Sequence, residues 1–354
     1  MPRPPLRRGW TTGACATAAA KAAYGALIGR GFADSVTIRL PRGGTAAFAL
    51  AERRLGAGEA AAAVVKDAGD DPDVTHGCLV RATVRRNPPG VGVTFHAGEG
   101  VGTVTRVGLQ VPLGEPAVNP VPRQMMRDAV AELGGVDVAI TIAIPGGEAL
   151  ASRTLNGRLG IVGGLSILGT TGVVVPYSCS SWVHSIHRGI DVARAAGLDH
   201  VAAATGSTSE QAVRMLHGLP EMALLDMGDF VGGTRKYLRR NPVPRLTLAG
   251  GFGKLAKLAQ GHLDLHSSRS RLDQAALAQL AEQRGAPQGL ASAVAGANTA
   301  NEALALAEEA AFPLGDLVAA EAQAVGRETV GPAVALEVIV VDRQGRIAGR
   351  VAGW

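Results

Sequence analysis

Three strand–turn–helix units follow one another between residues 200 and 259, and they constrain the fold more than any other feature. Apolar segments at 200–204, 222–226 and 245–249 are each followed by a polar or glycine-containing turn and then by a segment with helical spacing, at 211–216, 230–238 and 255–259. Strands that alternate with helices in this way are typical of a parallel sheet with helices on its faces. Ligands of such sheets bind beyond the carboxyl ends of the strands.

Polar and glycine residues follow each of these three predicted strands. Thr205, Gly206 and Ser207 would offer hydroxyls and backbone N–H groups at a helix N-terminus. Asp226 ends the second strand, about twenty residues later, where an acidic residue commonly holds ribose hydroxyls. The turn 250–254 would let a ligand approach the backbone and adds a lysine. We therefore expect an adenosyl-type ligand at this edge. The candidate cofactor-binding residues are Thr205, Gly206, Ser207, Asp226, Asp229, Gly250, Gly251, Gly253 and Lys254.

Common nucleotide fingerprints are absent from these turns. The Gly-x-Gly-x-x-Gly pattern of dinucleotide-binding sheets does not occur, which disfavours a dinucleotide. Gly-Gly-Phe-Gly-Lys at 250–254 resembles a P-loop only loosely, because the four-residue spacer and the Ser or Thr after the lysine are missing. A kinase-like enzyme that binds phosphates at this turn is the alternative reading.

The length of 354 residues and the hydrophobic content of 47% predict two domains. We place an α+β domain at residues 1–180 and an α/β domain with a Rossmann-like parallel sheet at 181–354. The first contains an alanine-rich helix that ends near residue 28, capped by Thr11 or Thr12, and a hairpin over residues 36–50. The second adds a long helical region at 271–311 and a final strand at 334–342.

An acidic turn at residues 67–76 carries four aspartates and a histidine. Such density could hold a cation or raise the pKa of one carboxyl enough to make a base, which singles out Asp70 and Asp71. A solvated turn, in which Asp side chains bond their own backbone, explains the pattern equally well. A second polar segment, at 262–269, contains His266 and is read either as an acid/base site or as a plain loop.

The sequence predicts no metal site. Cys15, Cys78 and Cys179 are isolated, which argues against structural zinc and against a disulfide framework and fits a reducing compartment. His184 and His187 lie at i, i+3 on a predicted helix without an acidic neighbour, so we read them as helix-surface residues.

A glycine-rich apolar stretch occupies residues 158–177. It predicts either a buried strand pair joined by a tight glycine turn or a surface that binds a polar ligand. The second reading uses the two hydroxyls and the unhindered backbone N–H groups of Leu-Gly-Thr-Thr-Gly at 168–172.

The formal charge of +5 comes without a basic run interleaved with aromatic residues, so no nucleic-acid partner is expected. No stretch approaches the length of a membrane span and no signal peptide is evident, so we expect a cytoplasmic protein with no membrane partner.

Six motifs, in order between residues 8 and 270, resemble the CbiD family, the cobalt-precorrin-5B C1-methyltransferases of anaerobic-type cobalamin biosynthesis. They are Arg-Gly-Trp-Thr-Thr-Gly-Ala-Cys at 8–15, residues 66–77, residues 108–123, residues 158–175, Gly-Asp-Phe-Val-Gly at 228–232, and residues 250–268. The resemblance implies transfer of a methyl group from S-adenosylmethionine to C1 of a cobalt-containing tetrapyrrole, with cobalt present only as part of that substrate. Handover to other enzymes of the pathway and a homodimer are both compatible with the sequence.

This substrate bears many carboxylates, which arginines can bind. The candidate substrate-binding residues are Thr12, Arg106, Arg123, Arg158, Gly163, Gly164, Thr170 and Thr171. We expect in-line attack by an enamine-type carbon on the sulfonium methyl, a reaction that needs mainly alignment and exclusion of water. If a proton must move, Asp70, Asp71 or His266 could carry it. A corrinoid-binding protein without catalytic activity is a further alternative.

Overall fold

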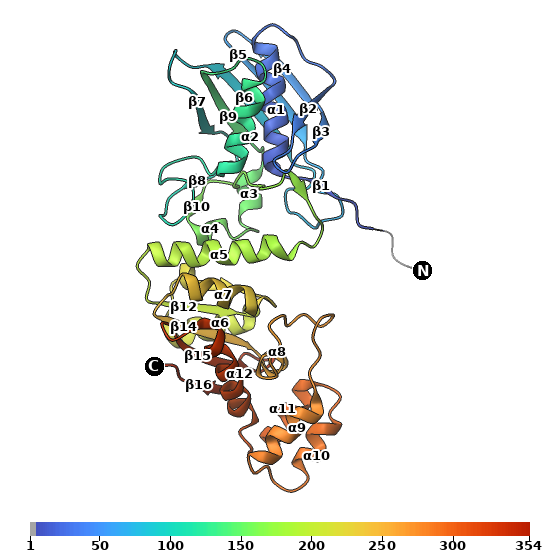
Figure 1. Ribbon diagram of the computed structural model, residues 1–354, viewed down its shortest axis with the longest axis vertical. Helices are drawn as coiled ribbons and strands as arrows, with labels where there is room; N and C mark the ends of the chain where they lie inside the picture. The colour runs from blue at the N-terminus through green and yellow to red at the C-terminus, as the bar shows by residue number, and fades with distance from the viewer. Residues whose placement is uncertain (1–4) are drawn as a thin grey trace. The chain divides into compact units, whose positions relative to one another are not determined.

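The computed structural model describes residues 5–354, and the chain divides into two compact units. Unit 1 is Met1–Cys179 and unit 2 is Ser180–Trp354. Figure 1 labels the elements of both.

Unit 1 is built on a five-stranded sheet with the order β4-β5-β6-β9-β7. The pairs β4/β5, β5/β6 and β6/β9 are antiparallel, and β7 lies parallel to β9. Its strands are β4 (Glu52–Gly56), β5 (Glu59–Val65), β6 (Leu79–Arg86), β7 (Val93–Ala97) and β9 (Val138–Ala143). In β9 the buried residues alternate with half-buried ones, as expected of a strand with one face on the core.

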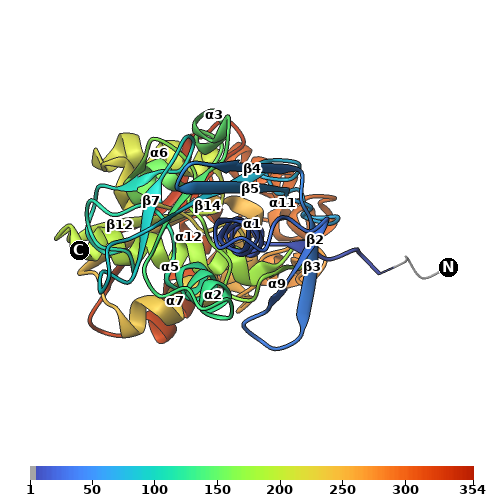
Figure 2. The same cartoon turned by 90° about the horizontal axis from the view of Figure 1, so that it is seen from above.

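Helix α1 (Thr12–Leu27) packs on this sheet together with α2 (Pro120–Ala131). Figure 2 shows α1 end-on, between strands β4 and β5 and the β2–β3 hairpin. Its alanines are almost all buried, because small side chains let the helix lie close to strands on several sides. The Thr11 hydroxyl caps the helix by accepting from the Ala14 N–H at 3.2 Å, so the prediction of a threonine cap is confirmed.

Smaller elements complete unit 1. The predicted hairpin is confirmed as the antiparallel pair β2 (Ser35–Arg39) and β3 (Thr45–Ala49). β1 (Gly9–Trp10) pairs with β11 (Val173–Val174), and β8 (Thr103–Val104) pairs with β10 (Ile161–Val162). Two short helices, α3 (Gly147–Ala151) and α4 (Asn156–Leu159), lie between β9 and β10.

The glycine-rich stretch is therefore not a strand pair joined by a turn, as one reading had it. Its two short strands, β10 and β11, pair with β8 and β1 instead of with each other. Close backbone packing explains the glycines: a Cβ at Gly164 would lie 2.3 Å from the Gly100 backbone, and one at Gly169 would lie 2.3 Å from the Thr11 hydroxyl.

Unit 2 contains a five-stranded sheet with the order β13-β12-β14-β15-β16. Its strands are β12 (His200–Ala204), β13 (Leu224–Asp226), β14 (Arg245–Gly251), β15 (Ala335–Val341) and β16 (Ile347–Val351). The first four strands in this order are parallel, which confirms the predicted parallel sheet. β16 runs antiparallel to β15 at the edge, and the sequence pattern did not reveal it.

Apolar side chains cover both faces of this sheet. Leu246 and Leu248 of β14 join the large core on one face, whereas Ala249 and Ile339 join a smaller core on the other. The helices of unit 2 are α5 (Cys179–Ala195), α6 (Ser207–His217), α7 (Val231–Arg240), α8 (Phe252–Ala259), α9 (Gln274–Gln283), α10 (Leu290–Gly296), α11 (Ala300–Glu309) and α12 (Leu314–Val330), with a 3-10 turn at Glu221–Ala223.

Four predicted boundaries in unit 2 are wrong. Strand β13 begins at Leu224, after the 3-10 turn at Glu221–Ala223, where the strand was predicted from Met222. Helix α6 begins at Ser207, separated from the end of β12 by only two residues, where a turn was expected to residue 210. Gly250 and Gly251 belong to β14 and Phe252 starts α8, so Gly-Gly-Phe-Gly-Lys is a strand-to-helix junction without a separate turn.

The predicted helical region 271–311 is divided into α9, α10 and α11. It is divided because Asp273 and Thr299 cap new helices and Gly289 adopts a left-handed conformation between them. Over residues 5–354, none of the helices is long and apolar enough to cross a membrane.

Candidate active site

A pocket of about 900 Å³ opens at the carboxyl ends of β12, β14 and β15 in unit 2. This volume lies in the range of small-molecule sites. β12 and β14 are neighbours although β13 lies between them in sequence, so the pocket sits where the strand order reverses. The pocket is lined by Thr205, Gly206, Ser207, Thr208, Ser209, Asp229, Gly251, Phe252, Gly253, Lys254, Lys257, Leu265, His266, Ser267, Leu272, Gln274, Asn298, Thr299, Ala300, Asn301, Val341, Asp342 and Arg343.

The first wall is the junction between β12 and α6. The backbone of Gly206 is extended, with φ 168° and ψ 170°, and α6 starts at the next residue. The first N–H groups of a helix have no acceptor within the helix and can bind a polar or anionic group. A Cβ built at Gly206 would meet no atom within 4 Å, so the backbone is open on that side.

The second wall is the junction between β14 and α8. Here Lys254 donates to the Thr205 carbonyl at 2.9 Å and forms an ion pair with Asp229 at 3.1 Å. The lysine thereby ties α8 to the loop after β12 and fixes the Asp229 carboxylate at the pocket. Gly250 lies behind this wall, where a Cβ would come within 2.8 Å of the Thr205 hydroxyl oxygen.

The remaining wall comes from the start of α11 and the end of β15, through Asn298, Thr299, Asn301, Asp342 and Arg343. None of these residues was predicted. Asp342 follows the last parallel strand, and the rule that ligands bind beyond strand ends could have identified it. Burial would raise the pKa of the Asp342 carboxyl, but hydrogen bonds from Arg346 and from backbone N–H groups hold the pKa below its ordinary value, so it is a carboxylate at neutral pH.

Most of the residues predicted in unit 2 meet at this pocket. Asp226 and Gly250 do not line it. Asp226 lies at the end of edge strand β13, and its carbonyl accepts from the Trp182 indole at 3.0 Å. His266 lines the pocket, and its ring Nδ1 lies 2.7 Å from the Ser268 hydroxyl. The predicted residues that do line the pocket are Thr205, Gly206, Ser207, Asp229, Gly251, Gly253, Lys254 and His266.

The acidic turn of unit 1 holds chain segments together. Asp70 accepts from the Arg7 backbone N–H at 2.6 Å, and Asp71 accepts from the Tyr177 backbone N–H at 2.8 Å. Asp70 is exposed and Asp71 is half-buried. Both carboxylates therefore have structural hydrogen bonds, and whether they also act in catalysis stays a prediction.

A buried ion pair underlies this turn. The side chain of Lys66 is only 2% exposed and contacts the Asp73 carboxylate and the Thr75 hydroxyl. Burial alone would raise the pKa of Asp73, but the charge of Lys66 and the hydrogen bonds from Lys66 and Thr75 lower it below its ordinary value. The turn is thus anchored by a charged pair inside unit 1.

Two of the predicted substrate-binding arginines lie side by side in unit 1. Arg106 donates to the Arg158 carbonyl at 3.2 Å. Arg123 is engaged internally, because its guanidinium donates to Glu115 at 2.9 Å and to the carbonyls of Pro116 and Val118. It therefore orders the segment before α2.

The small candidate residues of unit 1 differ in accessibility. Gly163 and Thr170 are exposed, and Gly163 has a left-handed φ of 83°. Gly164 and Thr12 are buried. The Thr171 hydroxyl donates to the Val173 carbonyl at 2.9 Å. Gly163 and Thr170 thus remain open to a ligand.

Comparison with known proteins gives matches along nearly the whole chain. The CbiD family model matches residues 2–176, and the model of the CbiD C-terminal domain matches residues 264–352. A protein of Paramagnetospirillum magneticum named cobalt-precorrin-5B C(1)-methyltransferase is 60% identical over 97% of this chain and 98% of its own length. Proteins of the same name from Bradyrhizobium sp. and Brucella anthropi are each 59% identical, over 99% and 98% of this chain and 94% and 96% of their own lengths.

A crystal structure of a cobalamin biosynthesis protein (cbiD) from Archaeoglobus fulgidus matches with a TM-score of 0.41 and 26% identity, covering 79% of this chain and 85% of that one. The family models and the near-full-length relatives identify the chain as a member of the CbiD family.

Proposed function

We propose that this chain is an enzyme of cobalamin biosynthesis that methylates C1 of cobalt-precorrin-5B, with S-adenosylmethionine as the methyl donor. The products would be cobalt-precorrin-6A and S-adenosylhomocysteine. The observation that carries the proposal is the identity of 58–60%, over almost the full length, with proteins named for this reaction.

The pocket of unit 2 is the proposed donor site. The sheet around it is Rossmann-like in its parallel strands and in the crossover between β12 and β14. Open backbone at Gly206 and Gly251 suits close contact with an adenosyl group. The carboxylates of Asp229 and Asp342 suit ribose hydroxyls or an ammonium group. The residues present therefore fit S-adenosylmethionine.

S-adenosylmethionine supplies a methyl group bound to a positively charged sulfur, which a carbon nucleophile displaces in line. The residues of this chain have to align the two reactants and exclude water. Lys254 contributes by fixing both Asp229 and the Thr205 carbonyl, so that the pocket walls keep their shape. His266 is the titratable ring at the pocket that we propose for any proton transfer.

Unit 1 is the proposed tetrapyrrole-binding side, with residues 1–180 as one domain and 181–354 as the other. Arg106, Arg123 and Arg158 stay the proposed partners of substrate carboxylates. Arg106 and Arg158 lie next to each other, and Arg123 also orders the segment before α2. Exposed Gly163 and Thr170 would allow the flat ring to approach the backbone. Homodimer formation, handover of the product and a cytoplasmic location stay predictions.

Calorimetry with S-adenosylhomocysteine and with ATP separates this proposal from a kinase-like enzyme. We expect micromolar binding of the first and none of the second; the reverse result would overturn the proposal. A corrinoid carrier without catalytic activity would bind the tetrapyrrole but transfer no labelled methyl. Unchanged turnover in Asp70→Asn, Asp71→Asn or His266→Gln would remove that residue from the reaction.

A further inference from the structure

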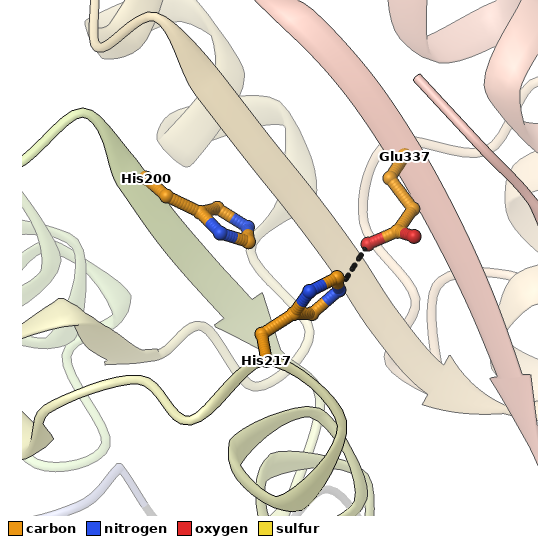
Figure 3. Close-up of side chains that lie close together, drawn as sticks. All are labelled: His200, His217 and Glu337. Atoms are coloured by element: carbon orange, nitrogen blue, oxygen red, sulfur yellow. Dashed lines mark hydrogen bonds and ion pairs between the residues drawn. The ribbon is translucent and has the colours of Figure 1, made fainter. Parts of the chain in front are cut away.

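Three polar side chains meet inside unit 2, at the end of the sheet opposite the pocket. His200 starts β12, His217 ends α6 and Glu337 lies in β15. Figure 3 shows the two imidazole rings and the carboxylate pointing toward one another. β12 separates this cluster from the pocket by five residues, which corresponds to about 16 Å of strand. The cluster is therefore not part of the donor site.

Two of these side chains, His200 and Glu337, are buried where apolar residues would be expected, and His217 is half-buried. Glu337 is 1% exposed and interrupts an otherwise apolar strand, and His200 is 8% exposed. Placing a carboxylate in such a position costs stability unless it is fully paired. His217 lies 2.7 Å from Oε2 of Glu337, and the Thr247 hydroxyl donates to the same oxygen at 2.6 Å. The Thr247 hydroxyl in turn lies 2.8 Å from Nε2 of His200.

The donor atoms form a convergent set. One nitrogen from each ring and one carboxylate oxygen lie within 4.8 Å of one another. In a tetrahedral site with bonds of about 2.1 Å, ligand atoms are about 3.4 Å apart. Atoms at the observed limit of 4.8 Å would have to approach by about 1.4 Å, which side-chain rotations can supply. We propose that His200, His217 and Glu337 form a binding site for a divalent transition-metal ion of the Zn²⁺ class.

The surroundings favour this assignment. Burial lowers the pKa of His200, which favours the neutral imidazole that binds a metal ion. Arg350 donates to the other carboxylate oxygen, Oε1, at 2.8 Å, which orients Glu337 and leaves Oε2 toward the rings. Trp354 covers both rings, with centroid distances of 4.9 Å to His200 and 6.1 Å to His217.

Metal binding exchanges hydrogen bonds for coordination. In the metal-bound form each ring is neutral with its proton on Nδ1, and Nε2 bonds the ion in place of its hydrogen-bond partner; any further ring proton is released to water. Such an ion would join β12, α6 and β15, three elements that are separate in sequence. The positive charge of Arg350 repels a bound cation and limits the affinity of the site, so we expect a micromolar Kd for the metal ion. A bound ion would also raise the thermal stability of the chain, because it binds only the folded state.

Titration of the full-length, chelator-treated protein with Co²⁺ and Zn²⁺ tests the site. We expect one equivalent of Co²⁺ to give visible absorption bands that Zn²⁺ abolishes. Quenching of tryptophan fluorescence by Co²⁺ should be reduced in Trp354→Phe, in which the absorption bands persist. Glu337→Gln and His217→Gln should each weaken binding at least tenfold. Glu337→Gln changes a buried strand and could fail to fold. His217 lies at the end of helix α6, where a substitution disturbs the fold less, so His217→Gln then provides the test.

His184→Ala is the matched control, because it removes a histidine that faces another histidine on α5, at a ring distance of 6.3 Å. We expect this variant to bind Co²⁺ as the wild type does. Absence of Co²⁺ binding by the wild type would overturn the proposal. Equal binding by His217→Gln, or loss of binding in His184→Ala, would overturn it as well. None of these readouts depends on methyl transfer, so the result is independent of the proposed function.

Discussion

Filling the pocket from Gly251 should weaken donor binding without disturbing the fold. Gly251 has φ −63° and ψ 149°, which any residue adopts, and a Cβ there would meet no atom within 4 Å. The side chain of Gly251→Val would therefore enter the pocket instead of the core. A ligand displaced from this wall loses about two backbone hydrogen bonds of about 1 kcal/mol each. We expect a loss of about 2 kcal/mol, or about 30-fold in the Kd of S-adenosylhomocysteine.

Isothermal calorimetry of the wild type and Gly251→Val measures this loss, and thermal unfolding shows whether the fold is intact. Gly296→Val is the matched control, because Gly296 also has open space around its Cβ position and does not line the pocket. Gly250→Ala is the opposite case: its Cβ would meet the Thr205 hydroxyl at 2.8 Å, so stability should fall. An unchanged Kd in Gly251→Val would refute the donor site.

Three further predictions concern the walls of the pocket and unit 1. Lys254→Met should raise the KM for the donor about tenfold in steady-state kinetics, because Asp229 and the Thr205 carbonyl lose a charge-assisted partner; an unchanged KM would remove Lys254 from the site. Asp73→Asn should destabilise unit 1 by about 3 kcal/mol in urea unfolding, since Lys66 stays buried without its counter-ion. The folded-state pKa of Asp73 is lowered, so its contribution is present above the ordinary value of 3.8 and is lost as the pH falls through the folded pKa; the variant should lack this acid dependence, and an unchanged acid profile would contradict the account. Thr11→Ala should cost about 1 kcal/mol through loss of the α1 cap, and Thr11→Ser should restore most of it in the same assay.

The sequence pattern predicted the parallel core of unit 2 well. Its strands are buried on both faces and give continuous apolar runs, and a helix follows each of β12, β13 and β14. Strand β12 was predicted with its observed bounds. The edge strand β16 was missed because Ile347–Val351 is short, contains glycine and arginine, and shows no clear alternation.

The site was predicted only where one local rule applied. Turns that follow the parallel strands located Thr205, Lys254 and their neighbours at the pocket. Asp226 follows the same rule but ends the edge strand β13, and strand order cannot be read from a single sequence. The wall formed by Asn298 and Asn301 depends on where α11 packs, which local spacing does not encode.

The cluster of His200, His217 and Glu337 was missed for a related reason. Its members are far apart in sequence and each is isolated among apolar or helical residues. The sequence instead drew attention to the densest polar segment, the acidic turn. Its aspartates accept hydrogen bonds from the backbone of segments near Arg7 and Tyr177, a tertiary role that composition does not distinguish from a catalytic one.

Methyl transfer from S-adenosylmethionine with a ¹³C-labelled methyl to cobalt-precorrin-5B, followed by NMR of the isolated product, tests the central claim most directly. The account predicts one labelled methyl on C1, formed together with S-adenosylhomocysteine, by the wild type and by Gly296→Val and much more slowly by Gly251→Val. A substrate recovered without label, or label on a different ring carbon, would contradict it.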